Sequence, residues 1–139
     1  MVVYLSGPIS GCSDEDANGW RDAVTKELEA LGIVVLNPMR RDHRGNEQRY
    51  ASAIVEEDKL DITMSDILLV HFGKNFARPG VGTSMEIILG WMLHKRIIVV
   101  HPAEAELSPW LTYHAHHLYT EMSSAVNKIQ RILKDISGD

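Results

Sequence analysis

Glu86 is the first residue whose position suggests chemistry. It comes three residues after Thr83 and directly before the apolar residues 87–89, a pattern that predicts a carboxylate in the first turn of a helix after a glycine-rich loop. The positive end of a helix helps to keep a carboxylate ionised, as a nucleophile must be. Thr-x-x-Glu is also the pattern of a capping box, in which Glu86 would only accept a hydrogen bond from the Thr83 N–H. The pattern alone leaves both interpretations open.

Asp58 is a second candidate, because it interrupts an apolar stripe. It lies four residues after Ile54 and four before Ile62, so the three side chains share one face of a predicted helix. A carboxyl group held among apolar neighbours can keep its proton near neutral pH and act as a general acid. The alternative is a solvated charge at the edge of the stripe. In that case the ordinary exposed face of the helix comprises Glu56, Glu57 and Asp61.

Other side chains could support a reaction at these carboxyl groups or have a purely structural role. Tyr4 places a phenol beside a turn with two glycines, where it either bonds a carboxylate or lies in the core. An arginine-rich loop could bind a phosphate through bidentate hydrogen bonds from its guanidinium groups. The alternative is that these arginines are simply exposed to solvent. These arginines are Arg40, Arg41 and Arg44. Three histidines (His114, His116 and His117) have no Cys or acidic partner at a helpful spacing, so no metal site is expected.

Composition narrows the class of protein. The chain has 139 residues, which fits a single domain over 1–139, and its net charge of −5 argues against binding a nucleic-acid polymer. The only cysteine, Cys12, suggests a reducing compartment. The sequence shows no signal-peptide pattern and no apolar run of membrane-spanning length, so we expect a cytoplasmic protein without a membrane partner.

The elements that position these residues follow from periodicity. Short apolar runs alternate with helical segments, as in a parallel sheet with crossover helices. The predicted strands are Val2–Ser6, Ile33–Leu36, Ile67–Phe72, Ile97–His101 and an edge strand around Tyr113–Tyr119, after a short helix near Pro109. The predicted helices run from Asp14 to a cap at Gly32, from Gln48 to Met64, from Thr83 to His94, and through Val126, Ile129, Leu133 and Ile136. Ligands bind at the carboxyl ends of such strands, where the glycine- and arginine-rich loops lie.

Four short motifs, taken in order, resemble the nucleoside 2-deoxyribosyltransferase family and its nucleotide-hydrolysing relatives. They are Tyr4-Leu-Ser-Gly-Pro-Ile, Asn37-Pro-Met-Arg, Asp58 with Ser65-Asp66, and Gly82-Thr-Ser-Met-Glu86-Ile. The resemblance implies an α/β, single-domain, flavodoxin-like doubly wound parallel sheet of about five strands with helices on both faces. It also implies that Glu86 is the nucleophile, Asp58 the acid/base for the leaving base, and Tyr4 the residue that orients Glu86. The substrate-binding residues expected by resemblance are Ser6, Gly7, Ile9, Gly11, Arg40, Gly80, Gly82 and Ser84.

The resemblance has two departures. Deoxyribosyltransferases commonly carry an acidic residue six positions before the nucleophile, where this chain has Gly80. The family's chain end often reaches a neighbouring subunit, whereas this chain ends in a plain amphipathic helix. Features such as Arg40 look closer to the hydrolases of nucleoside 5′-monophosphates.

The expected function is cleavage or exchange of the N-glycosidic bond of a (deoxy)nucleoside through a glycosyl-enzyme intermediate on Glu86. The partners would be a nucleoside or nucleotide and a free nucleobase, with no cofactor and no metal, in a homodimer or higher homo-oligomer. One alternative is a nucleoside 5′-monophosphate N-glycosidase that releases free base. A second is a non-catalytic nucleotide-binding sensor, in which Glu86 is only a helix cap.

Overall fold

The computed structural model describes residues 1–73 and 80–138 of the chain. Five parallel strands form one sheet, as the alternation of apolar runs and helical segments predicts. In chain order the strands are β1 (Val2–Ser6), β2 (Val34–Leu36), β3 (Ile67–His71), β4 (Arg96–Val100) and β5 (His117–Tyr119). Their spatial order is β2-β1-β3-β4-β5, which is the flavodoxin-like order, and the chain switches direction across the sheet at β1 and β3. The predicted fold class is therefore confirmed.

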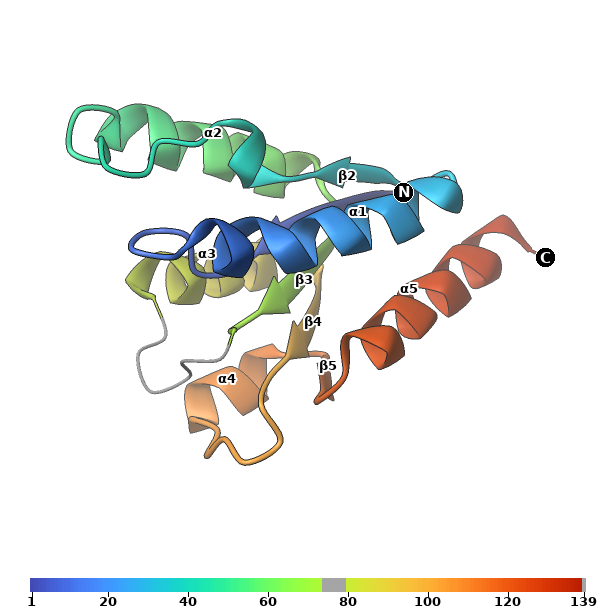
Figure 1. Ribbon diagram of the computed structural model, residues 1–139. Coiled ribbons are helices and arrows are strands. Elements are labelled where there is room, and N and C mark those ends of the chain that lie inside the picture. The colour runs from blue at the N-terminus through green and yellow to red at the C-terminus, as the bar shows by residue number, and fades with distance from the viewer. Residues whose placement is uncertain (74–79, 139) are drawn as a thin grey trace.

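Helices cover both faces of the sheet (Figure 1). One face carries α1 (Trp20–Ala30) and α5 (Met122–Ser137); the other carries α2 (Ala51–Met64), α3 (Val81–Met92) and α4 (Pro109–His114). Successive side chains of a strand point to opposite faces, so Val3 and Leu5 join the core under α1 and α5, whereas Tyr4 joins the core under α2 and α3. None of the helices in the described part of the chain is long and apolar enough to cross a membrane.

Gly90 lets α3 lie close to the sheet. A Cβ atom at this position would be 2.8 Å from Cδ2 of Leu68 on β3 and 3.0 Å from Cδ1 of Ile97 on β4. Glu86 lies one helical turn before Gly90, on the same side of α3. The close approach of the helix therefore brings the Glu86 carboxylate to the carboxyl end of β1.

The ends of several elements differ from the prediction. The third predicted helix, α3, starts at Val81 rather than Thr83, because Gly80 takes the N-cap position with non-helical backbone angles of φ −58° and ψ 137°. Tyr113 lies in α4 and not in an edge strand, because Ser108 caps a helix that has Pro109 at its first position. The edge strand is consequently reduced to β5.

The starts of the first two helices, α1 and α2, also differ from the prediction. A π-helical turn, Glu15–Gly19, precedes α1 where one continuous helix from Asp14 was expected. The second predicted helix, α2, begins at Ala51 and not at Gln48, since residues 47–50 form turns. The predicted stop at Gly32 is confirmed, because this residue follows α1 with a positive φ of 79°.

Candidate active site

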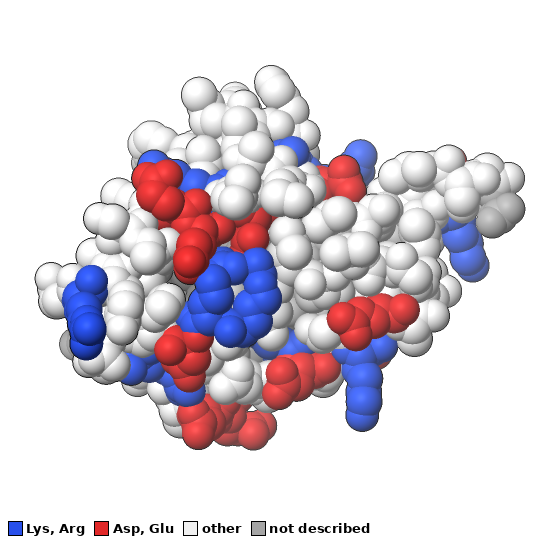
Figure 2. Space-filling model, turned by 90° about the horizontal axis from the view of Figure 1, so that it is seen from above, with Lys and Arg blue, Asp and Glu red and all other residues white. Residues whose placement is uncertain are grey.

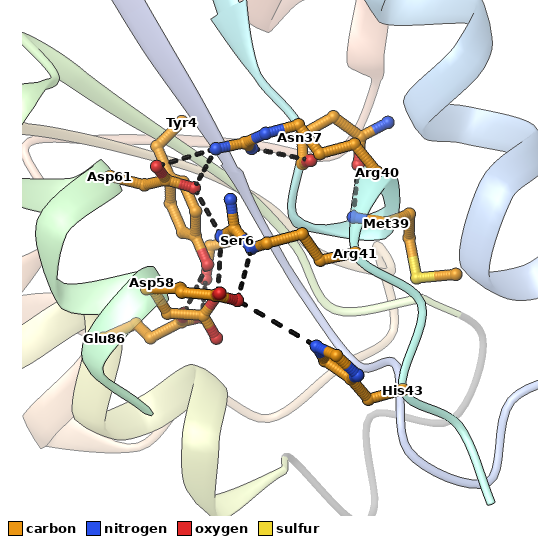
Figure 3. A network of polar contacts seen from close by, with 11 residues as sticks. Tyr4, Ser6, Asn37, Met39, Arg40, Arg41, His43, Asp58, Asp61 and Glu86 are labelled. Carbon is orange, nitrogen blue, oxygen red and sulfur yellow. Dashed lines mark hydrogen bonds and ion pairs between the residues drawn. The ribbon is translucent and has the colours of Figure 1, made fainter. Parts of the chain in front are cut away.

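The Glu86 carboxylate is held by two hydroxyl groups of β1 (Figure 3). The phenol of Tyr4 donates a hydrogen bond of 2.5 Å to Oε2 of Glu86, and the Ser6 hydroxyl donates one of 2.8 Å to Oε1. Glu86 lies in the second turn of α3, and the helix has no side-chain cap. The capping-box interpretation is therefore wrong. Both oxygens of Glu86 are instead fixed at the strand-order switch, where doubly wound sheets bind ligands.

Burial governs the charge of Glu86. It raises the pKa of this carboxyl from 4.5 to about 7, although the hydrogen bonds from Tyr4 and Ser6 and the positive charge of Arg21 oppose the rise. The expectation that a first-turn position keeps Glu86 fully ionised needs correction, because the residue lies one turn further into α3. Near neutral pH the carboxyl group is poised between its two forms.

Asp58, on α2, behaves as the interrupted stripe predicts. Burial raises the pKa of its carboxyl above the usual range, while Arg41 at 3.4 Å opposes the rise. Its helix neighbours Ile54 and Ile62 are part of the same cavity wall. Asp58 can therefore keep a proton at a higher pH than an exposed aspartate can.

Asp58 and Glu86 line one cavity of about 530 Å³. Its walls come from α2, the first half of α3 and the loops after β1 and β2. The wall mixes polar and apolar side chains, and its apolar residues are Pro8, Ile9, Pro38, Ile54, Val55, Ile62, Val81, Met85 and Leu89. A cavity of this size with two convergent carboxyl groups suits a small organic ligand.

The loop after β2 is fixed by ion pairs. One nitrogen of Arg40 contacts both oxygens of Asp61 at 2.8 Å, and Arg41 binds Oδ2 of the same residue at 2.7 Å. Asp61 is only 5% exposed, so the alternative that placed it on an exposed face of α2 is wrong for this residue. The two guanidinium groups compensate the burial of this carboxylate.

The cavity wall contains the cations Arg41, Arg44 and Lys59, of which the two arginines are closely paired and Lys59 lies 4.0 Å from Glu56. Arg41 contacts Glu57 at 2.8 Å in addition to its bonds with Asp58 and Asp61. Arg44 is paired with two acids, Asp14 and Asp42, and also donates to the carbonyl of Cys12. On the face shown in Figure 2, acidic and basic side chains are intermixed and no extended patch of one sign is seen.

Comparison with known proteins assigns the chain to a family. A family model described as nucleoside 2-deoxyribosyltransferase like matches residues 1–104, which is three quarters of the chain. The chain belongs to the nucleoside 2-deoxyribosyltransferase-like family. The resemblance inferred from four short motifs is thus confirmed. No curated protein matches the chain.

Solved structures share the fold of this family member at low sequence identity. A 2-deoxyribosyltransferase from Bacillus psychrosaccharolyticus is 19% identical with a TM-score of 0.68, over 91% of each chain. A CMP N-glycosidase from Clostridium botulinum is 16% identical with a TM-score of 0.64, over 94% of this chain and 99% of that one. A conserved protein from Enterococcus faecalis V583 is 12% identical with a TM-score of 0.71, over 94% of this chain and 97% of that one. These likenesses establish the fold.

The residues expected by family resemblance do not all reach the cavity. Those in its wall are Gly7, Ile9, Asp58, Gly80, Gly82 and Glu86, while Tyr4 and Ser6 act on Glu86 directly. Gly11 and Arg40 lie outside the wall, and Ser84 faces a second cavity of about 900 Å³ between α3 and α4. Lys74, Arg78 and Pro79, which the predicted glycine-rich loop contains, lie outside the described residues.

Several residues near the site had no signal in the sequence. His43 and Glu47 line the cavity, and Arg21 lies buried on α1 behind the end of β1. Their neighbours come from other segments, so no spacing rule identifies them.

The histidine run also separates in space. His114 faces the second cavity, whereas Nδ1 of His116 accepts a hydrogen bond from the Ile97 N–H. Within residues 1–73 and 80–138, no three His, Cys, Asp or Glu side chains are grouped so as to hold a metal ion.

Proposed function

We propose that this chain cleaves or exchanges the N-glycosidic bond of a (deoxy)nucleoside through a covalent ester on Glu86. The observation that carries the proposal is the Glu86 carboxylate, held by Tyr4 and Ser6 in the wall of a cavity that also contains Asp58. Membership of the nucleoside 2-deoxyribosyltransferase-like family supports the same reaction.

The reaction is a double displacement. The carboxylate of Glu86 attacks the anomeric carbon, the bond from this carbon to the base nitrogen breaks, and Asp58 gives its proton to the departing base. A glycosyl ester of Glu86 remains. In the second half, a free base or a water molecule attacks the same carbon, the ester bond breaks, and Asp58 takes the proton of the incoming group.

The two carboxyl groups need different protonation states for this reaction. Glu86 must be ionised to attack, and Tyr4 and Ser6 favour this form by donating to it. Asp58 must carry a proton, which burial favours. Burial raises the pKa of both carboxyl groups, so ionised Glu86 with protonated Asp58 is one protonation state of a coupled pair.

The charges around the cavity favour a nucleoside over a 5′-monophosphate. Arg41 and Arg44, in its wall, are already paired with carboxylates. The wall also contains four acidic residues, namely Glu47, Glu57, Asp58 and Glu86. Lys59, the other strong cation of the wall, lies 4.0 Å from Glu56, so four acids face one loosely paired cation and a phosphate dianion is disfavoured relative to a neutral nucleoside.

One observation favours the monophosphate N-glycosidase as a second candidate. The first turn of α3 begins in the cavity wall with Val81, Gly82 and Thr83. Backbone N–H groups at a helix N-terminus form a ready site for phosphate. A hydrolase for 5′-monophosphates would use this site together with Glu86 and Asp58.

The test is incubation of the protein with ribo- and deoxyribonucleosides and their 5′-monophosphates, each with and without a second free base. Exchange of bases that requires the acceptor supports the transferase, and base release from a monophosphate without acceptor supports the hydrolase. Trapping of a glycosyl ester on Glu86 by mass spectrometry tests the intermediate. A nucleotide that binds without turnover, with equal affinity for Glu86→Gln, would instead support the sensor.

The α3–α4 surface supports a homo-oligomer, which we propose as the form in solution. Trp110 and Tyr113 on α4 are 76% and 72% exposed, and Met85 and Met92 on α3 are 64% and 63% exposed. Large exposed apolar side chains that cluster on neighbouring helices mark association surfaces. Light scattering should give at least a dimer, and Trp110→Asp should yield monomer, whereas Ile136→Asp on α5 should not.

We also propose a cytoplasmic location, which the free thiol of Cys12 fits.

A further inference from the structure

Arg21 is a buried cation without an ion pair. It is 0% exposed, and among the described residues no carboxylate pairs with it. Its guanidinium group donates to the carbonyl oxygens of Ala17 at 2.7 Å and Gly7 at 2.9 Å, and lies 4.7 Å above the ring of Trp20. Leaving water costs a charged group several kcal/mol, so an unpaired buried arginine indicates a role that offsets this cost.

The contacts of Arg21 fix the backbone where β1 ends. Gly7, whose carbonyl it holds, directly follows Ser6, the residue that donates to Oε1 of Glu86. The Gly7 backbone also packs tightly against the end of β3, because a Cβ atom on Gly7 would lie 2.5 Å from the carbonyl oxygen of His71. The His71 ring in turn stacks on Trp20 at 5.0 Å. The Ser6 hydroxyl is therefore held between α1 and β3.

The positive charge of Arg21 acts on the reactive groups. It lowers the pKa of Glu86 and of Tyr4 against the effect of their burial, and it contributes to the low pKa of His71. Burial lowers the pKa of Arg21 itself to about 10, so the side chain stays charged at neutral pH.

We propose that Arg21 is a positioning residue for Glu86: it fixes the Ser6–Gly7 end of β1, whose Ser6 hydroxyl binds Glu86, and places a buried positive charge behind that end. The inference rests on the proposed function. Arg21 is not in the cavity wall and so acts through Glu86 without touching the substrate. Tyr4 and Ser6, the hydrogen-bond donors of Glu86, are neutral, and the charge of Arg21 adds a smaller effect that favours the anion against burial and the nearby Asp58.

Arginine is suited to this position and lysine less so. One guanidinium group reaches two carbonyl oxygens through separate nitrogens and stacks on an indole face. A lysine would keep the charge and lose part of this fixed geometry. Arg21→Lys and Arg21→Met therefore separate the two parts of the proposal, and Thr25→Val, one turn along α1, is a matched control because it changes a buried hydroxyl without changing charge.

The experiment is titration of the Glu86 carboxyl carbon by NMR in the full chain, combined with the pH profile of kcat/KM. Arg21→Met should raise the midpoint of the Glu86 titration and move the acid limb of the kcat/KM profile upward by about 0.3–0.5 pH unit, which lowers kcat/KM below pH 6 about two- to threefold. Arg21→Lys should leave the midpoint nearly unchanged and lower kcat with little change in KM. Thr25→Val should change neither.

Two outcomes would overturn the inference: a folded Arg21→Met variant in which Glu86 titrates as in wild type, or Arg21→Lys with unchanged kcat. If Arg21→Met does not fold, the kcat and KM of Arg21→Lys decide the positioning role. Arg21→Gln then takes the place of Arg21→Met in the NMR titration. The NMR titration needs no turnover, so it remains informative if the wild-type protein cleaves no nucleoside. That failure would count against the proposed function alone.

Discussion

The phenol of Tyr4 and the carboxylate of Glu86, which lie 82 residues apart in sequence, are joined by a hydrogen bond of 2.5 Å. The bond links the first strand to the second turn of α3, so it forms only when β1, β3 and α3 are all in place. Burial also raises the pKa of the Tyr4 phenol, and the negative charge of Glu86 raises it further. Tyr4 therefore remains a donor throughout the pH range in which the protein is folded.

Tyr4→Phe removes this donor with little change in shape. Hydrogen bonds to charged groups are worth about 1.5–3 kcal/mol, so kcat/KM should fall about 10- to 100-fold at neutral pH. The acid limb of the pH profile should also move upward, because Glu86 loses a group that favours its anion. Kinetics from pH 5 to 9 and thermal melting provide the measurement. An unchanged acid limb in a folded variant would show that the phenol does not control Glu86.

Glu86→Gln should stabilise the fold at pH 8 while it abolishes turnover. The folded pKa of Glu86, about 7, lies above the unfolded value of 4.5, so the folded state binds more protons between these limits. Stability contributed by the protonated carboxyl is complete below pH 4.5 and is lost as pH rises through 7. At about 1.4 kcal/mol per pKa unit the effect amounts to a few kcal/mol.

Urea unfolding of wild type and Glu86→Gln at pH 5 and pH 8 measures this linkage. The free energy of unfolding of Glu86→Gln should exceed that of wild type by more at pH 8 than at pH 5. The same advantage at both pH values would mean that Glu86 titrates near its ordinary pKa in the folded protein.

Asp58→Asn tests the proton donor through the shape of the pH profile. Attack requires ionised Glu86 and protonated Asp58, so wild-type kcat/KM should rise on the acid side and fall on the alkaline side. The two limbs belong to the coupled pair of carboxyl groups. Without the acid, kcat should fall about 10²- to 10⁴-fold and the alkaline limb should disappear. Retention of that limb in Asp58→Asn would assign it to another group.

The sequence predicted the sheet and singled out Asp58 and Glu86, which the structure places in one cavity wall. Strands and helices follow from local periodicity, and Asp58 was recognised because it broke the apolar repeat with Ile54 and Ile62. Family resemblance, and not spacing, linked Tyr4 to Glu86. The burial of Asp61 was not predicted, because its partners Arg40 and Arg41 lie in a loop about 20 residues earlier and leave no trace in the pattern of the helix.

Asp61→Ala, on α2, should be the most destabilising change in the ion-pair network that holds the loop after β2. It removes a buried carboxylate that binds Arg40 and Arg41, and leaves two guanidinium groups without their shared partner. The expected loss is about 1–3 kcal/mol, below that of a fully buried pair, because the Arg40 side chain is 42% exposed. Arg40→Ala should cost less, since Arg41 still neutralises Asp61. Chemical denaturation compares the two variants, and an equal cost would argue against the shared pair.

Gly90→Ala tests whether the close approach of α3 to the sheet places Glu86. The new methyl group would meet Leu68 and Ile97 at 2.8 and 3.0 Å, and overpacking of this kind typically costs about 1–3 kcal/mol. Gly82→Ala is the matched control in the same helix, because its Cβ meets nothing within 4 Å and should stabilise the helix by about 0.4–1 kcal/mol. Displacement of α3 should also lengthen the Tyr4–Glu86 hydrogen bond. Gly90→Ala should therefore lower kcat even under conditions in which the variant is fully folded. Equal unfolding free energies for the two variants would mean that the helix has room to move, and the placement of Glu86 would then depend on β1 alone.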